Sequence, residues 1–169
     1  AIRAKSEIVD RMTVVCIGGN PIGCEKPGWE FNFGNDVEAA NTVLHCGGDI
    51  WMIPNNVYGT MHIGFGEIQR RIAPYGEIGR LLYENLISFY ETENASWSAG
   101  ESWSLGDSPA VGVTLEPNCG SFMYCKAPEV QEDTSYRYPE NSPQIRVYTS
   151  INSRFIIEDF ISKLQILYG

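Results

Sequence analysis

Short apolar runs alternate with amphipathic stretches along this chain, a pattern that favours parallel strands joined by helices. The run at 12–19, MTVVCIGG, ends at two glycines and predicts a buried strand. The segment 35–48 starts at a helix-capping residue, Asn35 or Asp36, keeps its apolar residues on one face, and stops at two glycines, so it predicts a helix. The run at 50–54, IWMIP, predicts a second buried strand. Strand, helix and strand in this order form the crossover that parallel strands require.

The remainder of the chain carries the same two patterns. Helical periodicity predicts helices over 2–11, 77–90 and 153–167, and a further helix from Asp107 with Pro109 in its first turn. Strands are predicted at 121–126 and 145–151, and the polar segments 91–106 and 128–143 are predicted to be a loop and a surface excursion. We therefore predict one α/β domain over residues 1–169, with a mainly parallel sheet and helices on both faces.

Charge and composition exclude several classes of partner. The formal net charge of −9 argues against binding to a nucleic-acid backbone or to an anionic membrane surface. No apolar run approaches the ~20 residues that a membrane-spanning helix needs. The chain begins without Met and without the apolar middle of a signal peptide, so we expect its first residue to be an internal position. Five irregularly spaced cysteines predict reduced thiols in a cytoplasmic protein: Cys16, Cys24, Cys46, Cys119 and Cys125.

The loop EKPGWEFNFGND, residues 25–36, follows the first predicted strand, and ligands of open α/β sheets bind outside the carboxyl ends of the strands. Here Glu30 and Asn32 alternate with three aromatic residues, which are Trp29, Phe31 and Phe33. If the stretch is extended, the rings point one way and the two polar side chains the other, where they can bind the hydroxyls of a polar ligand. Alternatively, the rings pack on the core while Glu30 and Asn32 face solvent.

Other residues carry weaker signals. Asp107 opens a predicted helix, so it is either a cap or a ligand of a metal or of sugar hydroxyls. Trp97 and Trp103 lie in a segment too polar to need them for a core, and they could stack on a planar ring or cover an oligomer interface. A structural role is expected for His45 at the end of a helix, and His62 lies in a glycine-rich loop.

Four segments, in this order, resemble the inosine-uridine preferring nucleoside hydrolases: VVCIGGN, GWEFNFGNDVEAANTVL, DIWMIPNNV and GDSPAVGVTL. The resemblance runs along nearly all of this chain and covers the C-terminal half of a family member. It implies part of a Rossmann-like nucleoside hydrolase domain. It also implies an enzyme of purine or pyrimidine salvage that hydrolyses the N-glycosidic bond of ribonucleosides with the help of calcium, as a dimer or tetramer.

The resemblance also implies roles for four residues. Glu30 and Asn32 match the ribose-binding Glu and Asn of the family, and Asp107 matches its C-terminal aspartate, which binds calcium and ribose. Asn20 is the nearest match to an upstream asparagine that contacts the sugar.

The chain departs from the family pattern in two places. It lacks the D-x-D-x-x-x-D-D cluster that supplies the general base and most calcium ligands, and Gly106 stands where many members have a histidine. Catalytic residues are therefore not assigned, and residues 1–169 alone are expected to bind calcium weakly and not to hydrolyse nucleosides.

Several alternatives remain open on the sequence. The chain can be a non-catalytic or truncated homologue that binds a nucleoside or ribose, or that only packs against a partner. A thiol hydrolase would pair Cys24 or Cys46 with His62. Contacts to the base could come from Trp97, Trp103 or His62, and these residues do not decide which base is preferred.

Overall fold

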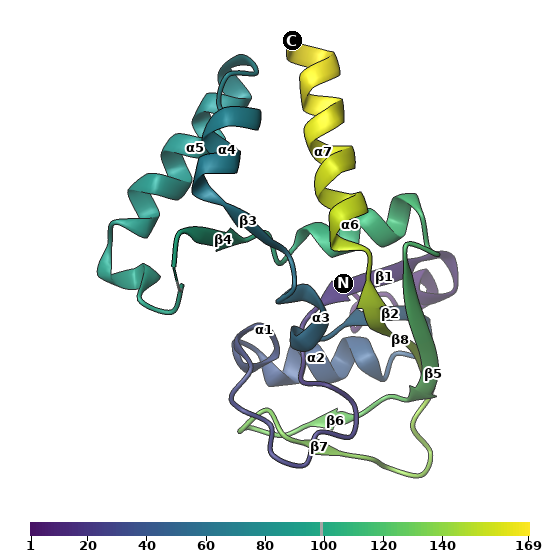
Figure 1. The fold of residues 1–169 in the computed structure, drawn as a ribbon. Helices are drawn as coiled ribbons and strands as arrows, with labels where there is room; N and C mark the ends of the chain where they lie inside the picture. Colours follow the sequence, from purple (N-terminus) through teal and green to yellow (C-terminus); the bar gives the residue numbers. More distant parts are fainter. Residues whose placement is uncertain (99) are drawn as a thin grey trace. The chain divides into compact units, whose positions relative to one another are not determined.

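The structure, a computed structural model, describes residues 1–98 and 100–169 and contains two compact units (Figure 1). The first unit comprises residues 1–58 and 109–151, and the second comprises residues 59–108 and 152–169.

A four-stranded sheet forms the centre of the first unit. Its strands, in spatial order, are β1 (Thr13–Ile17), β2 (Asp49–Ile53), β8 (Gln144–Ile151) and β5 (Gly120–Lys126). The pairs β1–β2 and β2–β8 are parallel, whereas β5 is antiparallel to β8. The predicted mainly parallel α/β sheet is thus confirmed, and the antiparallel strand lies at one edge.

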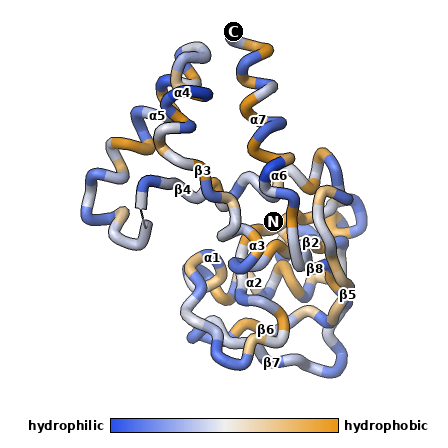
Figure 2. The backbone as a smooth tube through the Cα atoms, in the orientation of Figure 1, coloured by the Kyte–Doolittle hydropathy of each residue, from blue (hydrophilic) through white to orange (hydrophobic). Residues whose placement is uncertain are grey.

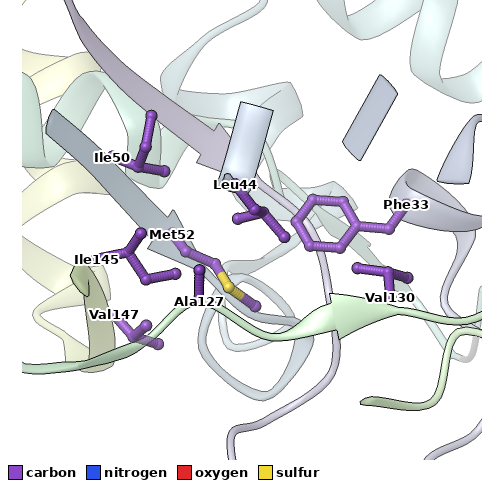
Figure 3. Packing of buried hydrophobic residues seen from close by; sticks show 8 residues of the cluster. All are labelled: Phe33, Leu44, Ile50, Met52, Ala127, Val130, Ile145 and Val147. Atoms are coloured by element: carbon purple, nitrogen blue, oxygen red, sulfur yellow. The ribbon is translucent and has the colours of Figure 1, made fainter. Parts of the chain in front are cut away.

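Helix α2 (Val37–Leu44) connects β1 to β2 and covers one face of this sheet. Asp36 caps it, because its Oδ1 accepts a hydrogen bond from the Ala39 amide at 2.8 Å. The buried cluster beneath α2 is shown in Figure 3 and consists of Phe33, Leu44, Ile50, Met52, Ala127, Val130, Ile145 and Val147. Burying each larger side chain of this kind stabilises the fold by about 1.5–3 kcal/mol, so the cluster fixes the register of α2 on the sheet.

Two one-turn helices follow the parallel strands of this unit. Helix α1 (Phe31–Gly34) lies between β1 and α2, and α3 (Asn55–Tyr58) follows β2 directly. Both therefore lie near the carboxyl ends of the strands that precede them.

On the opposite face of the sheet, aromatic rings surround the charged side chain of Arg146. The Arg146 guanidinium lies 4.0 Å from the ring centroid of Trp51 and 4.4 Å from that of Phe122. On the same face the Tyr148 hydroxyl donates to the Pro117 carbonyl at 3.1 Å, so the segment that follows α6 (Ser108–Leu115) covers this side. Figure 1 shows α6 on the side of the sheet away from α2.

The second unit joins an antiparallel pair of strands to three helices. The strands are β3 (His62–Gly64) and β4 (Ser102–Ser104), and the helices are α4 (Phe65–Arg71), α5 (Gly76–Tyr90) and α7 (Ser153–Tyr168). Its hydrophobic core cluster contains the buried residues Ile63, Ile68, Ile72, Ile161 and Leu164. In Figure 2, α7 alternates between hydrophobic and hydrophilic positions, as an amphipathic helix should. The helices predicted at 77–90 and 153–167 are confirmed.

Three of the predicted segments differ in the structure. Residues 2–11 contain the 3₁₀ helix η1 (Ser6–Arg11) rather than a helical tail. The predicted loop 91–106 contains the 3₁₀ helix η2 (Glu93–Ala95) and strand β4, which pairs with β3. The segment 128–143 contains the hairpin of β6 (Glu129–Val130) and β7 (Tyr136–Arg137), and part of it is buried.

Side-chain hydrogen bonds, which hydropathy does not reveal, explain why this polar hairpin packs. The Asn41 side chain on α2 accepts from the Val130 amide at 2.8 Å and donates to the Val130 carbonyl at 2.9 Å. It thus satisfies both backbone groups of a residue in this short strand.

Within the described residues, no helix is both long enough and apolar enough to cross a membrane.

Candidate functional site

The loop that follows β1 lies at the carboxyl ends of the parallel strands. The Gly18 amide donates to the Ile53 carbonyl at 3.0 Å, and the Asn55 amide donates to the Gly19 carbonyl at 2.9 Å. Gly19 has a φ of +85°, and a Cβ there would come within 2.3 Å of the Tyr136 hydroxyl. Only glycine therefore fits where the chain leaves β1. This position at the strand ends is where open α/β sheets bind their ligands.

The WEFNF stretch is not extended, so the condition for the alternation of its side chains is not met. Helix α1 begins directly after Glu30, whose side chain accepts from the Asn32 amide at 3.1 Å and from the Phe33 amide at 2.9 Å. A carboxylate that caps its own helix favours a turn over a strand.

The burial of this stretch also differs from both sequence-based readings. Phe33 is buried, whereas the side chains of Trp29 and Phe31 are exposed, at 60% and 65%. The alternative in which Glu30 faces solvent is wrong as well, because Glu30 is 2% exposed. One ring and one carboxylate therefore turn inwards together.

Two further donors complete the hydrogen bonding of Glu30. The Gly19 amide donates to Oε2 at 2.8 Å, and the Tyr58 hydroxyl donates to Oε1 at 2.7 Å. Each carboxylate oxygen therefore accepts two hydrogen bonds, which is the capacity of the group. The protein itself occupies every acceptor position of this side chain.

Asn20 is held in the same manner. Its Nδ2 donates to the Gly28 carbonyl at 3.0 Å and to the Thr134 carbonyl at 3.1 Å, and its Oδ1 accepts from Asn55 Nδ2 at 3.1 Å. The side chain is 2% exposed, and both of its N–H donors bind backbone carbonyls of the protein.

Thr134, at the tip of the β6–β7 hairpin, is a part of this site that the sequence did not reveal. Its Oγ1 accepts from the Glu30 amide at 2.8 Å and donates to the Gly28 carbonyl at 3.2 Å. Tyr136 donates its hydroxyl to the Asn20 carbonyl at 3.0 Å, and burial raises the pKa of Tyr136 well above its ordinary value, so it remains a donor. Both residues lie in a polar segment without a recognisable motif, more than a hundred positions after their partners.

The buried polar residues of the described chain are Asn20, Glu30 and Thr134, and they form one network. A buried polar network is stable when all its members are satisfied. We call this set, with Gly28 and Tyr58, the Glu30 network.

Asn32 differs from its neighbours in having an available side chain. Its backbone amide is bonded to Glu30, but within the described residues no hydrogen bond reaches its side-chain amide. The side chain is half-buried and lies beside Gly18 at the end of β1. Since an amide can donate and accept, Asn32 can bind a hydroxyl-bearing ligand here.

Asp107 belongs to the second unit and is not part of the Glu30 network. It is exposed and precedes the first residue of α6, Ser108, which confirms the predicted helix start. Of the four predicted site residues, the structure brings Asn20, Glu30 and Asn32 together at the end of β1.

The two histidines have few polar contacts. His45 Nε2 lies 3.1 Å from the Pro128 carbonyl oxygen, a contact that joins the end of α2 to the start of the polar segment 128–143. His62, on β3, lies 3.4 Å from Ser102 Oγ through its Nδ1.

The two tryptophans of the predicted loop have different surroundings. The Trp103 ring packs between Phe89 and Trp97, at centroid distances of 5.7 and 5.2 Å, and it contacts the buried cluster of its unit. The expectation that no core needs Trp103 is therefore wrong, whereas Trp97 is 62% exposed.

The fold and this site define an α/β protein with a polar turn at the carboxyl ends of its parallel strands, the arrangement of a ligand-binding domain. A model of the family described as "Inosine-uridine preferring nucleoside hydrolase" matches residues 1–157. The chain belongs to this family, as the resemblance in its sequence indicated. No curated protein sequence is significantly similar to the chain.

Solved structures show the same fold at low sequence identity. A plant nucleoside hydrolase aligns with a TM-score of 0.72 and 14% identity, over 98% of this chain and 57% of its own. A purine-preferring ribonucleoside hydrolase from Gardnerella vaginalis aligns with a TM-score of 0.73 and 18% identity, over 99% of this chain and 57% of its own. An inosine-guanosine nucleoside hydrolase aligns with a TM-score of 0.72 and 14% identity, over 100% of this chain and 58% of its own. The chain thus spans little more than half the length of these enzymes.

Members of this family bind a metal ion, but the residues described here do not form a metal site by themselves. Within residues 1–98 and 100–169, no three His, Cys, Asp or Glu side chains come together as a ligand set. Calcium takes about 6–8 oxygen ligands, and Asp107 alone does not meet this requirement.

Proposed function

We propose that the whole protein hydrolyses the N-glycosidic bond of ribonucleosides to ribose and free base, and that residues 1–169 form the C-terminal portion of its single domain. Family membership supports a nucleoside hydrolase. The observation that carries the role of this chain is Asn32, whose side-chain amide is available beside the end of β1.

Within this proposal the four predicted residues have different tasks. Asn32 donates to and accepts from ribose hydroxyls. Glu30 contacts the sugar only if a ribose hydroxyl replaces one of its present donors, and the Tyr58 hydroxyl is the side-chain donor among them. Asn20 holds the loop in shape, and it contacts the sugar only after it loses one of its backbone partners. The exposed Asp107 carboxylate binds calcium and the sugar.

Calcium is proposed as the cofactor of the whole protein, with Asp107 as one ligand. The other ligands and the general base would come from outside residues 1–169, because the described residues contain no ligand set. We accordingly propose that these residues alone bind calcium weakly and do not turn over nucleosides. By family resemblance we further propose a homodimer or homotetramer, a cytoplasmic location and a role in nucleoside salvage.

One alternative has a specific observation in its favour. Because Glu30 and Asn20 have their hydrogen bonds filled by the protein, few free groups face a substrate, and this favours a non-catalytic homologue that binds ribose or nucleoside through Asn32 or only packs against a partner.

The thiol route is less favoured. Its candidate pair, Cys24 or Cys46 with His62, has no observation in its favour among the described residues, since the side-chain contact of the His62 ring is to Ser102 Oγ at 3.4 Å. Burial raises the pKa of the other three cysteines, Cys16, Cys119 and Cys125, so these remain protonated thiols.

The test is a base-release assay on the whole protein with inosine and with uridine. Release that is lost with EDTA and reduced by Asn32→Ala supports the proposal. The matched control is Asn35→Ala, because Asn35 is exposed at the end of the same short helix. Ribose binding without base release would establish the non-catalytic alternative, and activity that resists EDTA but is lost with iodoacetamide would establish the thiol route.

A further inference from the structure

Thr134 occupies a backbone conformation that its residue type disfavours. Its φ is +63°, and no other non-glycine residue in the described chain has a positive φ. The left-handed region is unfavourable for L-residues, and β-branched residues adopt it only as outliers. Such strain persists only where the surrounding structure enforces it.

The hairpin around Thr134 has a loop in which glycine normally takes this position. Gln131 donates its amide to the Ser135 carbonyl at 2.9 Å, and the Thr134 amide donates to the Gln131 carbonyl at 2.9 Å. Three-residue hairpin loops of this kind end in a left-handed residue, usually glycine. The turn itself therefore gives no reason for a threonine.

The contacts of Thr134 supply the reason. Its hydroxyl bridges two backbone groups of the loop that leads to α1, the Glu30 amide and the Gly28 carbonyl, and its own carbonyl accepts from Asn20. Thr134 is 1% exposed, so in the folded chain the Glu30 amide and the Gly28 carbonyl depend on this hydroxyl rather than on bulk water. A glycine would relieve the backbone strain but would remove the protein acceptor of the Glu30 amide.

The hairpin is also held at its β6 strand, because Asn41 on α2 binds both backbone groups of Val130. The tip is thus anchored to the first unit rather than being a free loop.

We propose that Thr134 is a positioning residue: through its hydroxyl, the tip of the β6–β7 hairpin holds the turn of Gly28, Glu30 and Asn32 in its ligand-binding shape. The hydrogen-bond part of this inference stands by itself, and only its consequence for ligand binding rests on the proposed function.

The test compares Thr134→Gly with Thr134→Ser by residue-resolved amide hydrogen exchange. The glycine variant removes the hydroxyl and relieves the strain, so the chain is expected to fold. Exchange of the Glu30 and Gly19 amides should accelerate about tenfold, the effect of one lost hydrogen bond, while the amides of β2 exchange as before. The serine variant keeps the hydroxyl and should stay within about twofold of the wild type.

Thr149→Val is the matched control, because it removes another hydroxyl of the same unit, one that donates to the Ser121 carbonyl at 3.2 Å. It should leave the Glu30 and Gly19 amides unchanged. The proposal would be overturned if the Glu30 and Gly19 amides of Thr134→Gly exchanged at the wild-type rate. It would also be overturned if their exchange were accelerated equally in Thr134→Ser and Thr134→Gly.

A kinetic measurement on the whole protein tests the consequence for binding. Thr134→Gly should raise KM about tenfold and change kcat less than about threefold, because the residue acts on ligand binding through Asn32. An unchanged KM alongside accelerated exchange would overturn the link to binding. Absence of turnover in the wild type would refute the proposed function, and the exchange result would still decide the role of Thr134.

Discussion

Two carboxylates precede short helices in this chain, and their surroundings are opposite. Glu30, before α1, is 2% exposed and accepts four hydrogen bonds from its own protein. Asp107, before α6, is exposed and belongs to the other unit. The family resemblance assigns both residues to the sugar. Their environments indicate that Glu30 mainly builds the turn, whereas Asp107 is available to a ligand.

The difference shows how one motif can combine structure and binding. A carboxylate that organises a turn must be buried and saturated, and a carboxylate that binds a ligand must keep free acceptor positions. In the WEFN sequence Glu30 organises the turn, and we propose that the side-chain amide of Asn32 binds the ligand in its place. Substitutions of Glu30 and Asp107 should therefore separate folding from binding.

The largest effect on stability is expected for Glu30→Ala. The change leaves the buried Gly19 and Phe33 amides without an acceptor, and each unsatisfied group costs about 1–3 kcal/mol, so the free energy of unfolding should fall by about 3 kcal/mol or more. Denaturant titration followed by circular dichroism measures this change.

Asp36→Ala is the control for Glu30→Ala, since Asp36 caps α2 through a single bond at an exposed position. Loss of such a cap costs about 1 kcal/mol. If the two variants were equally stable, the Glu30 network would not be holding the turn.

The second effect concerns Asp107→Ala in the whole protein. Removal of an exposed carboxylate should change stability by less than about 0.5 kcal/mol. Base release should nevertheless fall about a hundredfold or more, equivalent to about 2.7 kcal/mol, if the residue binds calcium and sugar as proposed. Glu140→Ala, which removes another exposed carboxylate, should change neither quantity. Full activity in Asp107→Ala would remove this residue from the proposed site.

The sequence predicted the parts of this fold that depend on regular periodicity. The strands β1, β2 and β8, with α2, α5 and α7, follow from runs that bury one face or both. It did not predict α1, because the capping bonds of Glu30 outweigh the alternation of WEFNF.

The sequence also could not reveal the tip of the β6–β7 hairpin. Thr134 is polar, lies in a polar segment, and is buried only because its partners come from a loop more than a hundred residues earlier. Family motifs identified Glu30 and Asn32 as candidate site residues. The motifs did not reveal that, within the described residues, the Glu30 carboxylate is filled by hydrogen bonds from the protein whereas the Asn32 side chain is not.

A smaller effect is expected for Asn32→Ala. The Asn32 side chain hydrogen-bonds to no described residue, so its loss should change stability by less than about 1 kcal/mol. In the whole protein kcat/KM should fall about tenfold, the value of one or two hydrogen bonds to a ligand. Asn35→Ala again serves as the control. A stability loss as large as that of Glu30→Ala would mean that Asn32 belongs to the scaffold.

The smallest effect is expected at the hairpin that supports the Glu30 network. Arg137 donates to Glu129 at 2.7 Å, and this hydrogen bond lowers the pKa of Glu129 from its ordinary value of 4.5. A carboxylate whose folded-state pKa is lowered stabilises the fold above its ordinary pKa, and that contribution is lost as the pH falls through the lowered value. The difference in denaturation midpoint between wild type and Glu129→Gln should therefore be present at neutral pH and disappear in acid. A difference that grows in acid would show that the Arg137 contact does not govern this titration.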